Sequence, residues 1–153
     1  MENKIALVTG STSGIGKAIA QELLNKGVKV IISSNLDESE INLTDFHNSQ
    51  NATYFNFDIS KKDEIENVYS KIKNEFGKLD FLVANAGIMP RPCGIDDITE
   101  EVMDKTINVN LKGTFWTLKI LGKLIQETSS AGTIVTLTSV DGLIGEPYGV
   151  IYS

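Results

Sequence analysis

The sequence is poor in cysteine, histidine and proline, and it has no long apolar run. One Cys, one His and three Pro occur among its 153 residues. A single Cys forms no internal disulfide, which favours a reducing compartment and a cytoplasmic location. No apolar segment approaches the roughly 20 residues that a membrane-spanning helix needs. The uncharged residues 5–9 are too few for the core of a secretion signal, so we expect no membrane or secretory role.

Basic residues are the minority among the charged ones. The chain has 14 Lys and Arg against 20 Asp and Glu, a formal net charge of −6. It has no basic block, and phosphate neutralisation needs clustered Lys and Arg, so nucleic acid is excluded as the expected partner. Neither His47 nor Cys93 has a neighbour at ligand or nucleophile spacing, so we expect no metal site. The length predicts one domain over residues 1–153, or a piece of one.

Short apolar runs alternate with longer amphipathic stretches. Buried strands are predicted at residues 5–8, 28–32, 53–57, 81–84 and 133–138. Helices are predicted at residues 14–26, 60–76, 99–111 and 113–127, with Ser60 and Thr99 as N-caps and Phe115 facing inward. Residues 34–51 are predicted as a poorly formed helix or a loop. The alternation predicts an α/β fold, a doubly wound parallel sheet of the Rossmann type with strand order 3-2-1-4-5.

Several polar or glycine positions directly follow the predicted strands. The first strand leads into the run Gly10, Ser11, Thr12, Ser13, Gly14, Ile15 and Gly16. Glycines at such a junction let a pyrophosphate approach the helix N-terminus, although a purely structural turn is the alternative. Asp58, Asn85 and Ser139 also follow strands and are expected at the same sheet edge. Their structural alternatives are a helix cap, a turn former and an ordinary hydroxyl, and Asn110 could be a packing or kink residue.

These motifs resemble those of the ordinary, non-extended branch of the short-chain dehydrogenase/reductase family. The matching positions, in chain order, are Thr9, Gly10, Gly14, Ile15, Gly16, Asp58, Asn85, Ala86, Gly87, Asn110, Ser139 and Tyr152. The resemblance implies that the glycine loop, Asp58 with Ile59, and Asn85-Ala86-Gly87 bind a nicotinamide cofactor. It implies that Asn110, Ser139 and Tyr152 are catalytic, in hydride transfer between NAD or NADP and a small carbonyl or alcohol substrate.

The family's catalytic Lys follows its Tyr and would fall beyond Ser153. We therefore expect a C-terminally truncated family member that lacks this Lys and the last strands and is impaired as an enzyme. A non-catalytic dinucleotide-binding or interaction module is the alternative. The resemblance also implies that the parent enzyme is a homo-oligomer, paired partly through the helix at 113–127.

Cofactor choice is expected to depend on the end of the second strand. The ribose-reading position falls on Ser34 and Asn35, where an NAD-specific protein would usually carry Asp or Glu. From Ser34 onward the first carboxylate is that of Asp37, and no Arg or Lys occurs at position 35 or in residues 11–13. The sequence therefore favours NADP slightly over NAD.

Overall fold

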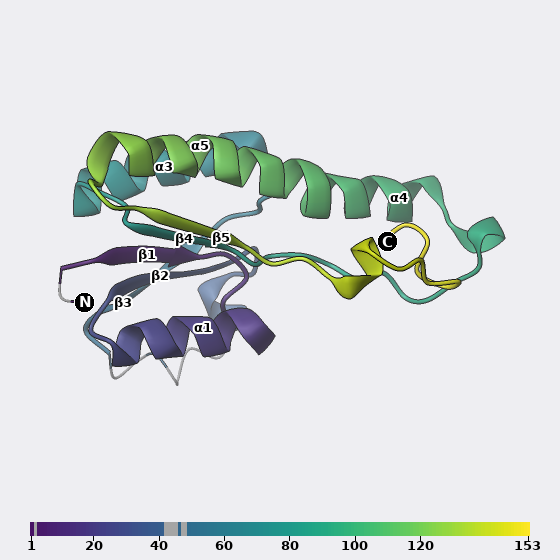
Figure 1. The fold of residues 1–153 in the computed structure, drawn as a ribbon, viewed down its shortest axis with the longest axis horizontal. Helices are drawn as coiled ribbons and strands as arrows, with labels where there is room; N and C mark the ends of the chain where they lie inside the picture. Colours follow the sequence, from purple (N-terminus) through teal and green to yellow (C-terminus); the bar gives the residue numbers. More distant parts are fainter. Residues whose placement is uncertain (2, 42–45, 47–48) are drawn as a thin grey trace.

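A computed structural model describes residues 1, 3–41, 46 and 49–153, and its centre is one five-stranded sheet (Figure 1). Its strands are β1 (Ile5–Val8), β2 (Lys29–Ser34), β3 (Ala52–Asn56), β4 (Phe81–Ala84) and β5 (Thr133–Thr136). The strand order is β3-β2-β1-β4-β5, and all four neighbouring pairs are parallel. This confirms the predicted doubly wound sheet. Part of the predicted loop at 34–51, including His47, lies outside the described residues.

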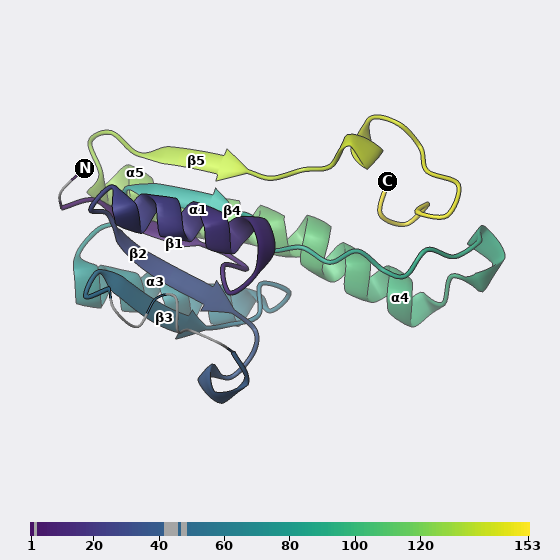
Figure 2. The same cartoon turned by 90° about the horizontal axis from the view of Figure 1, so that it is seen from below.

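Helices cover both faces of the sheet. The covering helices are α1 (Gly14–Asn25), α3 (Lys62–Phe76) and α5 (Thr114–Thr128), whereas α4 (Glu100–Thr106) lies beyond the carboxyl ends of the strands. In Figure 1, α1 lies below the sheet, and α3 and α5 lie side by side above it. Figure 2 shows the strands running in one direction, so their carboxyl ends share an edge. None of the helices described is long and apolar enough to cross a membrane.

Alternating side chains of β1 divide the core into two clusters. Ile5 and Leu7 are buried with residues of α3 and α5, whereas Ala6 and Val8 are buried with residues of α1. A strand places successive side chains on opposite faces, so a continuous apolar run fits a sheet covered on both sides. The run at residues 5–8 therefore anchors the loop that follows it between two packed layers.

The helix ends agree with the capping predicted from the sequence, except at the start of α3. Gly77 ends α3 with a φ of 73°, and Thr99 caps α4 by accepting the Val102 N–H at 3.3 Å. The predicted Ser60 cap is wrong, because α3 begins one residue later, after Lys61. The Ser60 N–H instead donates to Asp58 Oδ1 at 2.8 Å, in a turn that precedes the helix.

A π-helical segment (Ile107–Gly113) joins α4 to α5. The two predicted helices are therefore one continuous rod, visible in Figure 1. A π turn holds more residues than an α turn, so it shifts the apolar face of the helix that follows. Phe115, predicted to face inward, is 54% exposed and packs edge-on against Trp116.

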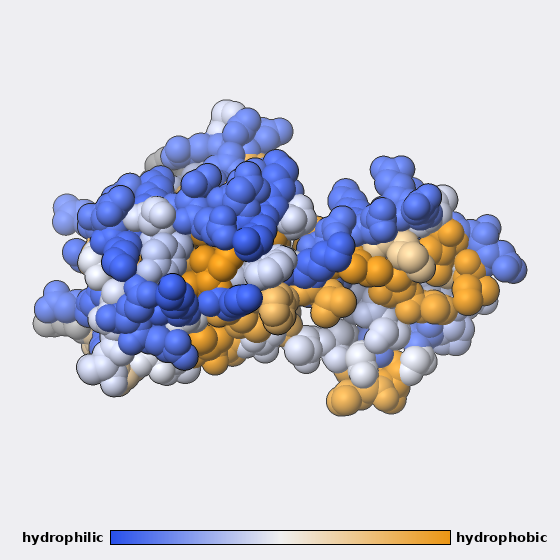
Figure 3. All heavy atoms as spheres, turned by 90° about the horizontal axis from the view of Figure 1, so that it is seen from above, coloured by the Kyte–Doolittle hydropathy of each residue, from blue (hydrophilic) through white to orange (hydrophobic). Residues whose placement is uncertain are grey.

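β5 is an edge strand with little cover. Ile134 and Val135 are 43% and 48% exposed, and the strand ends at Thr136, two residues earlier than predicted. Beyond it the chain runs out to the C-terminal turns, which Figure 2 shows well away from the sheet. Figure 3 shows apolar surface in the middle and on the right of the molecule. Exposed apolar residues of the rod, β5 and the C-terminal segment include Leu111, Phe115, Ile134, Val140, Leu143 and Ile144.

One buried carboxylate ties together the amino-terminal ends of the central strands. The Asp80 side chain is only 2% exposed, and it accepts bonds from Lys4 Nζ, the Ile5 N–H and Ser129 Oγ at 2.9–3.0 Å. Lys78 Nζ lies 3.0 Å from its second oxygen. Burial raises the pKa of Asp80, but these four donors outweigh burial and hold the pKa well below its usual range. The charged cluster lies at the sheet edge opposite the carboxyl ends.

Candidate functional site

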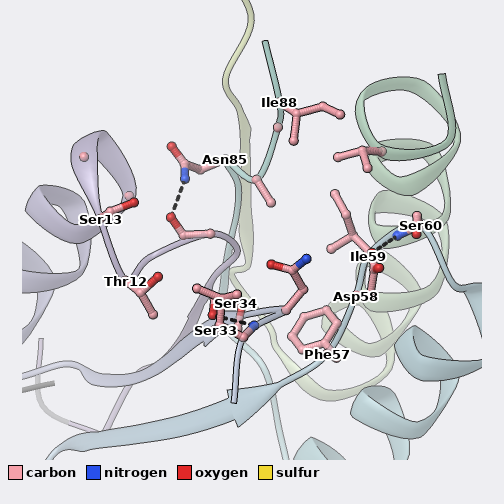
Figure 4. A pocket seen from close by; sticks show the side chains of 18 of the residues that line it. Thr12, Ser13, Ser33, Ser34, Phe57, Asp58, Ile59, Ser60, Asn85 and Ile88 are labelled. Carbon is pink, nitrogen blue, oxygen red and sulfur yellow. Dashed lines mark hydrogen bonds between the residues drawn. The ribbon is translucent and has the colours of Figure 1, made fainter. Parts of the chain in front are cut away.

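A cleft of about 920 Å³ opens at the carboxyl ends of the strands (Figure 4). This volume is in the range of small-molecule and cofactor sites. Every predicted cofactor-binding residue except Ser11 lines it: Gly10, Thr12, Ser13, Gly14, Ile15, Gly16, Ser34, Asn35, Asp58, Ile59, Asn85, Ala86 and Gly87. The fold therefore brings together segments that are up to 77 residues apart in the sequence, Gly10 to Gly87.

Ser11 lies behind the loop. It is fully buried, its hydroxyl donates to the Val8 carbonyl at 2.7 Å, and it accepts the Ser33 N–H at 2.9 Å. The Ser11 N–H also donates to the Ser33 carbonyl at 2.9 Å. Ser11 thus fastens the glycine loop to the end of β2 and leaves its neighbours Thr12 and Ser13 to face the cleft.

The N-terminus of α1 faces the cleft with its donors free of any side-chain cap. Ser13 is the N-cap residue, yet its hydroxyl makes no capping hydrogen bond, and the first turn holds no acidic residue. Gly14 has a φ of +55°, and a Cβ at this position would meet no atom within 4 Å. The loop therefore leaves an open cradle beside exposed N–H groups and the positive end of the helix dipole. Such a cradle suits a pyrophosphate.

Asn85 clamps the glycine loop to β4. Its Nδ2 donates to the carbonyls of Thr9 and Gly10 at 2.8 and 3.0 Å. Thr9 Oγ1 in return accepts the N–H groups of Asn85 and Ala86, both at 3.0 Å. A Cβ on Gly16 would lie 2.4 Å from Asn85 Nδ2, so glycine is required there by close approach. Asn85 is therefore more than a turn former.

Asp58 both lines the cleft and organises the turn before α3. Its Oδ1 accepts the Ser60 N–H, and its own N–H donates to Glu64 Oε2 at 2.6 Å. Asp58 therefore does not cap α3, whose N-cap residue is Lys61, but holds the turn that precedes it. Gly113 packs behind the neighbouring Ile59, because a Cβ there would lie 2.8 Å from the Ile59 carbonyl oxygen.

The end of β2, where the sequence predicts the ribose-reading position, forms one side of the cleft. Ser34 and Asn35 line it, as predicted, together with Leu36. The Asp37 carboxylate is not among the lining groups, and its Oδ1 accepts a bond from Asn56 Nδ2 at 2.8 Å. No carboxylate of the described residues lines this end, and Asp58 is the only acidic lining residue.

Eight residues that line the cleft are not among the site residues predicted from the sequence: Ser33, Leu36, Phe57, Ser60, Ile88, Lys105, Asn108 and Val109. Phe57 and Ser60 flank Asp58 and Ile59 in the sequence, so the prediction of that pair is the signal from which their place in the cleft could be predicted. Lys105 of α4 belongs to no motif, whereas Asn108 and Val109 of the π segment directly precede the predicted catalytic Asn110. They reach the cleft because the long rod crosses the sheet edge.

The three predicted catalytic residues do not line this cleft. Asn110 lies in the π segment, and its amide pairs with the Ile88 backbone: Oδ1 accepts the N–H and Nδ2 donates to the carbonyl, both at 2.8 Å. Ser139 accepts the Asp141 N–H at 3.2 Å, and the Tyr152 N–H donates to the Gly149 carbonyl at 2.8 Å. Over the described part of the chain, no hydrogen bond joins any two of these three residues.

The sequence and the fold both match known dehydrogenases. A family described as short chain dehydrogenase matches residues 4–153. Short-chain dehydrogenase reductase 3a of Arabidopsis thaliana is 33% identical over 147 residues, which are 96% of this chain and 57% of the relative. An NAD-dependent glycerol dehydrogenase of Listeria innocua is 35% identical over 150 residues, 98% of this chain and 58% of the relative.

A solved structure agrees. The crystal structure of levodione reductase superposes with a TM-score of 0.87 at 25% identity, covering 99% of this chain and 60% of the other. The chain thus spans somewhat more than half the length of the relatives it matches. The matched family, the shared fold and the cleft built from the family's motifs lead to one conclusion: this chain belongs to the short-chain dehydrogenase/reductase family.

Proposed function

We propose that the protein represented by this chain is a nicotinamide-dependent oxidoreductase that acts on a small carbonyl or alcohol substrate. The observation that carries the proposal is the cleft itself, in which the glycine loop, Asp58 and the Asn85-Ala86-Gly87 turn face one another. The cradle at Gly14 and the uncapped N-terminus of α1 fit a pyrophosphate. The Asp58-Ile59 end fits an adenine ring.

The bound nicotinamide would supply the chemistry of hydride transfer, and the protein would supply orientation and one proton. In the proposed reaction, Ser139 holds the substrate oxygen and Tyr152 gives or takes the proton at its phenol oxygen. Asn110 supports a water path for that proton. The two bonds to Ile88 hold the Asn110 amide in place and leave it one N–H and one lone pair for this support.

Binding without turnover is the second candidate function. It is favoured by one observation, namely that Ser139 and Tyr152 lie outside the lining of the cleft. In this reading, residues 1–153 form a dinucleotide-binding module. We further propose that the whole protein is a homo-oligomer that pairs through α5, where Phe115 is exposed.

The cofactor is NAD or NADP. The lack of a carboxylate among Ser34, Asn35 and Leu36 supports NADP, as the sequence suggests. The hydrogen bonds that Ser34 makes with Tyr54 and Leu36 support NAD. The Listeria relative is named as an NAD-dependent enzyme.

A pair of glycine variants tests the proposed site. Titration of the chain with NADH, followed by nucleotide fluorescence, is expected to show binding that Gly14→Val weakens about tenfold or more, because the side chain fills the cradle. Gly27→Val is the matched control. Gly27 has a φ of +77° and a Cβ there would also meet no atom within 4 Å, but Gly27 lies outside the cleft. Equal losses of affinity in the two variants would contradict the site, because backbone strain alone would then explain them.

A further inference from the structure

Tyr54 of β3 contacts the segment that reads the adenosine ribose, although Tyr54 itself does not line the cleft. Its hydroxyl lies 2.5 Å from the Leu36 carbonyl oxygen, 3.0 Å from Ser34 Oγ and 3.4 Å from the Ser34 carbonyl oxygen. The Leu36 N–H donates to Ser34 Oγ at 3.1 Å. These bonds form a closed ring of Ser34, Tyr54 and Leu36.

Counting protons in this ring fixes the direction of each bond. The phenol has one proton, and a carbonyl oxygen has none to give. The Tyr54 proton therefore lies on the bond to its nearest oxygen, that of Leu36. With that proton used, the contact between the two hydroxyls needs the proton of Ser34. Ser34 thus donates to Tyr54, accepts from Leu36, and keeps one lone pair for the cleft.

The Tyr54 phenol keeps its proton near neutral pH. Burial raises its pKa, the bond with Ser34 lowers it, and the negative charges of Asp37, Glu38 and Glu40 raise it again, with a net increase. The same three carboxylates place a negative field at the hydroxyl ring. They would repel any further anion brought to Ser34.

We infer that Tyr54 is a positioning residue for cofactor choice: it holds the Ser34 hydroxyl as a hydrogen-bond acceptor and thereby favours NAD over NADP. A ribose 2′-hydroxyl can donate to Ser34, whereas a 2′-phosphate brings only acceptor oxygens and finds no proton there. Asn35 does not discriminate, since its amide offers both a donor and acceptors. The inference rests on the proposed dinucleotide site and reverses the cofactor preference that the sequence suggests.

The test is the ratio of the NADPH and NADH dissociation constants, measured on the chain by fluorescence titration. The unmutated chain is expected to bind NADH about fivefold more tightly, which is the value of one ordinary hydrogen bond. Tyr54→Phe frees the Ser34 proton for the phosphate, so the ratio should fall about fivefold, mainly through tighter NADPH binding. A structural defect alone would weaken both nucleotides and leave the ratio in place.

Two further variants complete the design. Tyr69→Phe is the matched control, because it removes a Tyr hydroxyl that bonds Glu127 between α3 and α5, far from the ring. Its ratio should equal that of the unmutated chain. Ser34→Ala removes the acceptor itself and should bring the ratio close to one by weakening the binding of NADH. This variant tests the inference even if Tyr54→Phe does not fold. In the Ser34→Ala background, adding Tyr54→Phe should change nothing more.

Four results would overturn the inference. These are tighter NADPH than NADH binding by the unmutated chain, an unchanged ratio in folded Tyr54→Phe, an unchanged ratio in Ser34→Ala, and a shift of equal size in Tyr69→Phe. Failure to bind either nucleotide would overturn the proposed site, and this inference with it. Binding without the expected ratio leaves the proposed site standing, so the two failures are distinguishable.

Discussion

Gly16 is the position where a single methyl group should do most damage to the loop. A Cβ there would lie 2.4 Å from both Asn85 Nδ2 and the Gly10 carbonyl oxygen. Neither atom belongs to a flexible side-chain end, because Asn85 Nδ2 is held by the Thr9 and Gly10 carbonyls at 2.8 and 3.0 Å. Gly16→Ala must therefore displace the Asn85 amide, the loop backbone, or both.

The magnitude follows from the bonds at risk. Losing both Asn85 bonds costs about 1 kcal/mol each, and forcing a methyl group into a packed site adds about 1–3 kcal/mol. The better helix propensity of Ala returns about 0.5–1 kcal/mol. We expect the free energy of unfolding to fall by about 2–4 kcal/mol. Gly14→Ala meets no atom, so it should lose only about 1–2 kcal/mol through its positive φ.

Urea unfolding followed by circular dichroism measures these free energies. A double-mutant cycle with Asn85→Ala isolates the clash, since without the amide and its two hydrogen bonds Gly16→Ala should cost about 2 kcal/mol less. Two results would refute the reasoning. One is a Gly16→Ala variant as stable as Gly14→Ala. The other is a full Gly16→Ala cost that persists in the Asn85→Ala background.

Three further outcomes are expected. Asp80→Asn should lower the free energy of unfolding by about 2–3 kcal/mol at pH 7. Because the folded pKa of Asp80 lies below the unfolded value of about 3.9, its contribution is complete above that value and is lost as the pH falls below it. The gap between variant and unmutated chain should thus shrink below about pH 4 in urea unfolding at stepped pH, and a constant gap would contradict this. Thr117→Val should raise the free energy of unfolding by about 1 kcal/mol, because the buried hydroxyl has no partner and Val keeps its shape; a lower melting temperature would count against it. Residues 1–153 should show no turnover above a Ser139→Ala control in an NADH-oxidation assay, and measurable Ser139-dependent turnover would place the catalytic residues in the cleft.

The sheet and most of the cleft can be predicted because their signals are local. Strand order follows from the alternation of elements, and the glycine loop is contiguous from Gly10 to Gly16. Asp58 and Asn85 are predicted at the site because each directly follows a strand. The carboxyl ends of parallel strands must meet at one edge, so no knowledge of side-chain contacts is needed.

The rest depends on contacts between distant segments. Tyr54 carries no motif, and its bond to Leu36 exists because the parallel register pairs Ile32 of β2 with Tyr54. The π segment between α4 and α5 gives no periodic signal at 100° per residue, so the sequence predicts two helices where the structure has one continuous rod. The sequence also does not predict that the buried Ser11 holds the glycine loop to β2, because its hydrogen-bond partner Ser33 lies 22 residues away.

The two edges of the sheet differ in the charged groups that they carry. At the amino-terminal edge, a buried carboxylate gathers two ammonium groups, and its charge stabilises the junction of β1 and β4. At the opposite edge, the cleft is built from glycines, hydroxyls and amides, and one acidic residue lines it. An anionic ligand brought to a chain with a net charge of −6 needs such an edge, because unpaired carboxylates there would oppose it. Besides Asp58, the carboxylates of Asp37, Glu38 and Glu40 act near the end of β2, where their charges raise the pKa of Tyr54. The chain should therefore accept a pyrophosphate at the glycine loop and discriminate against a second phosphate at Ser34, the position that we propose Tyr54 controls.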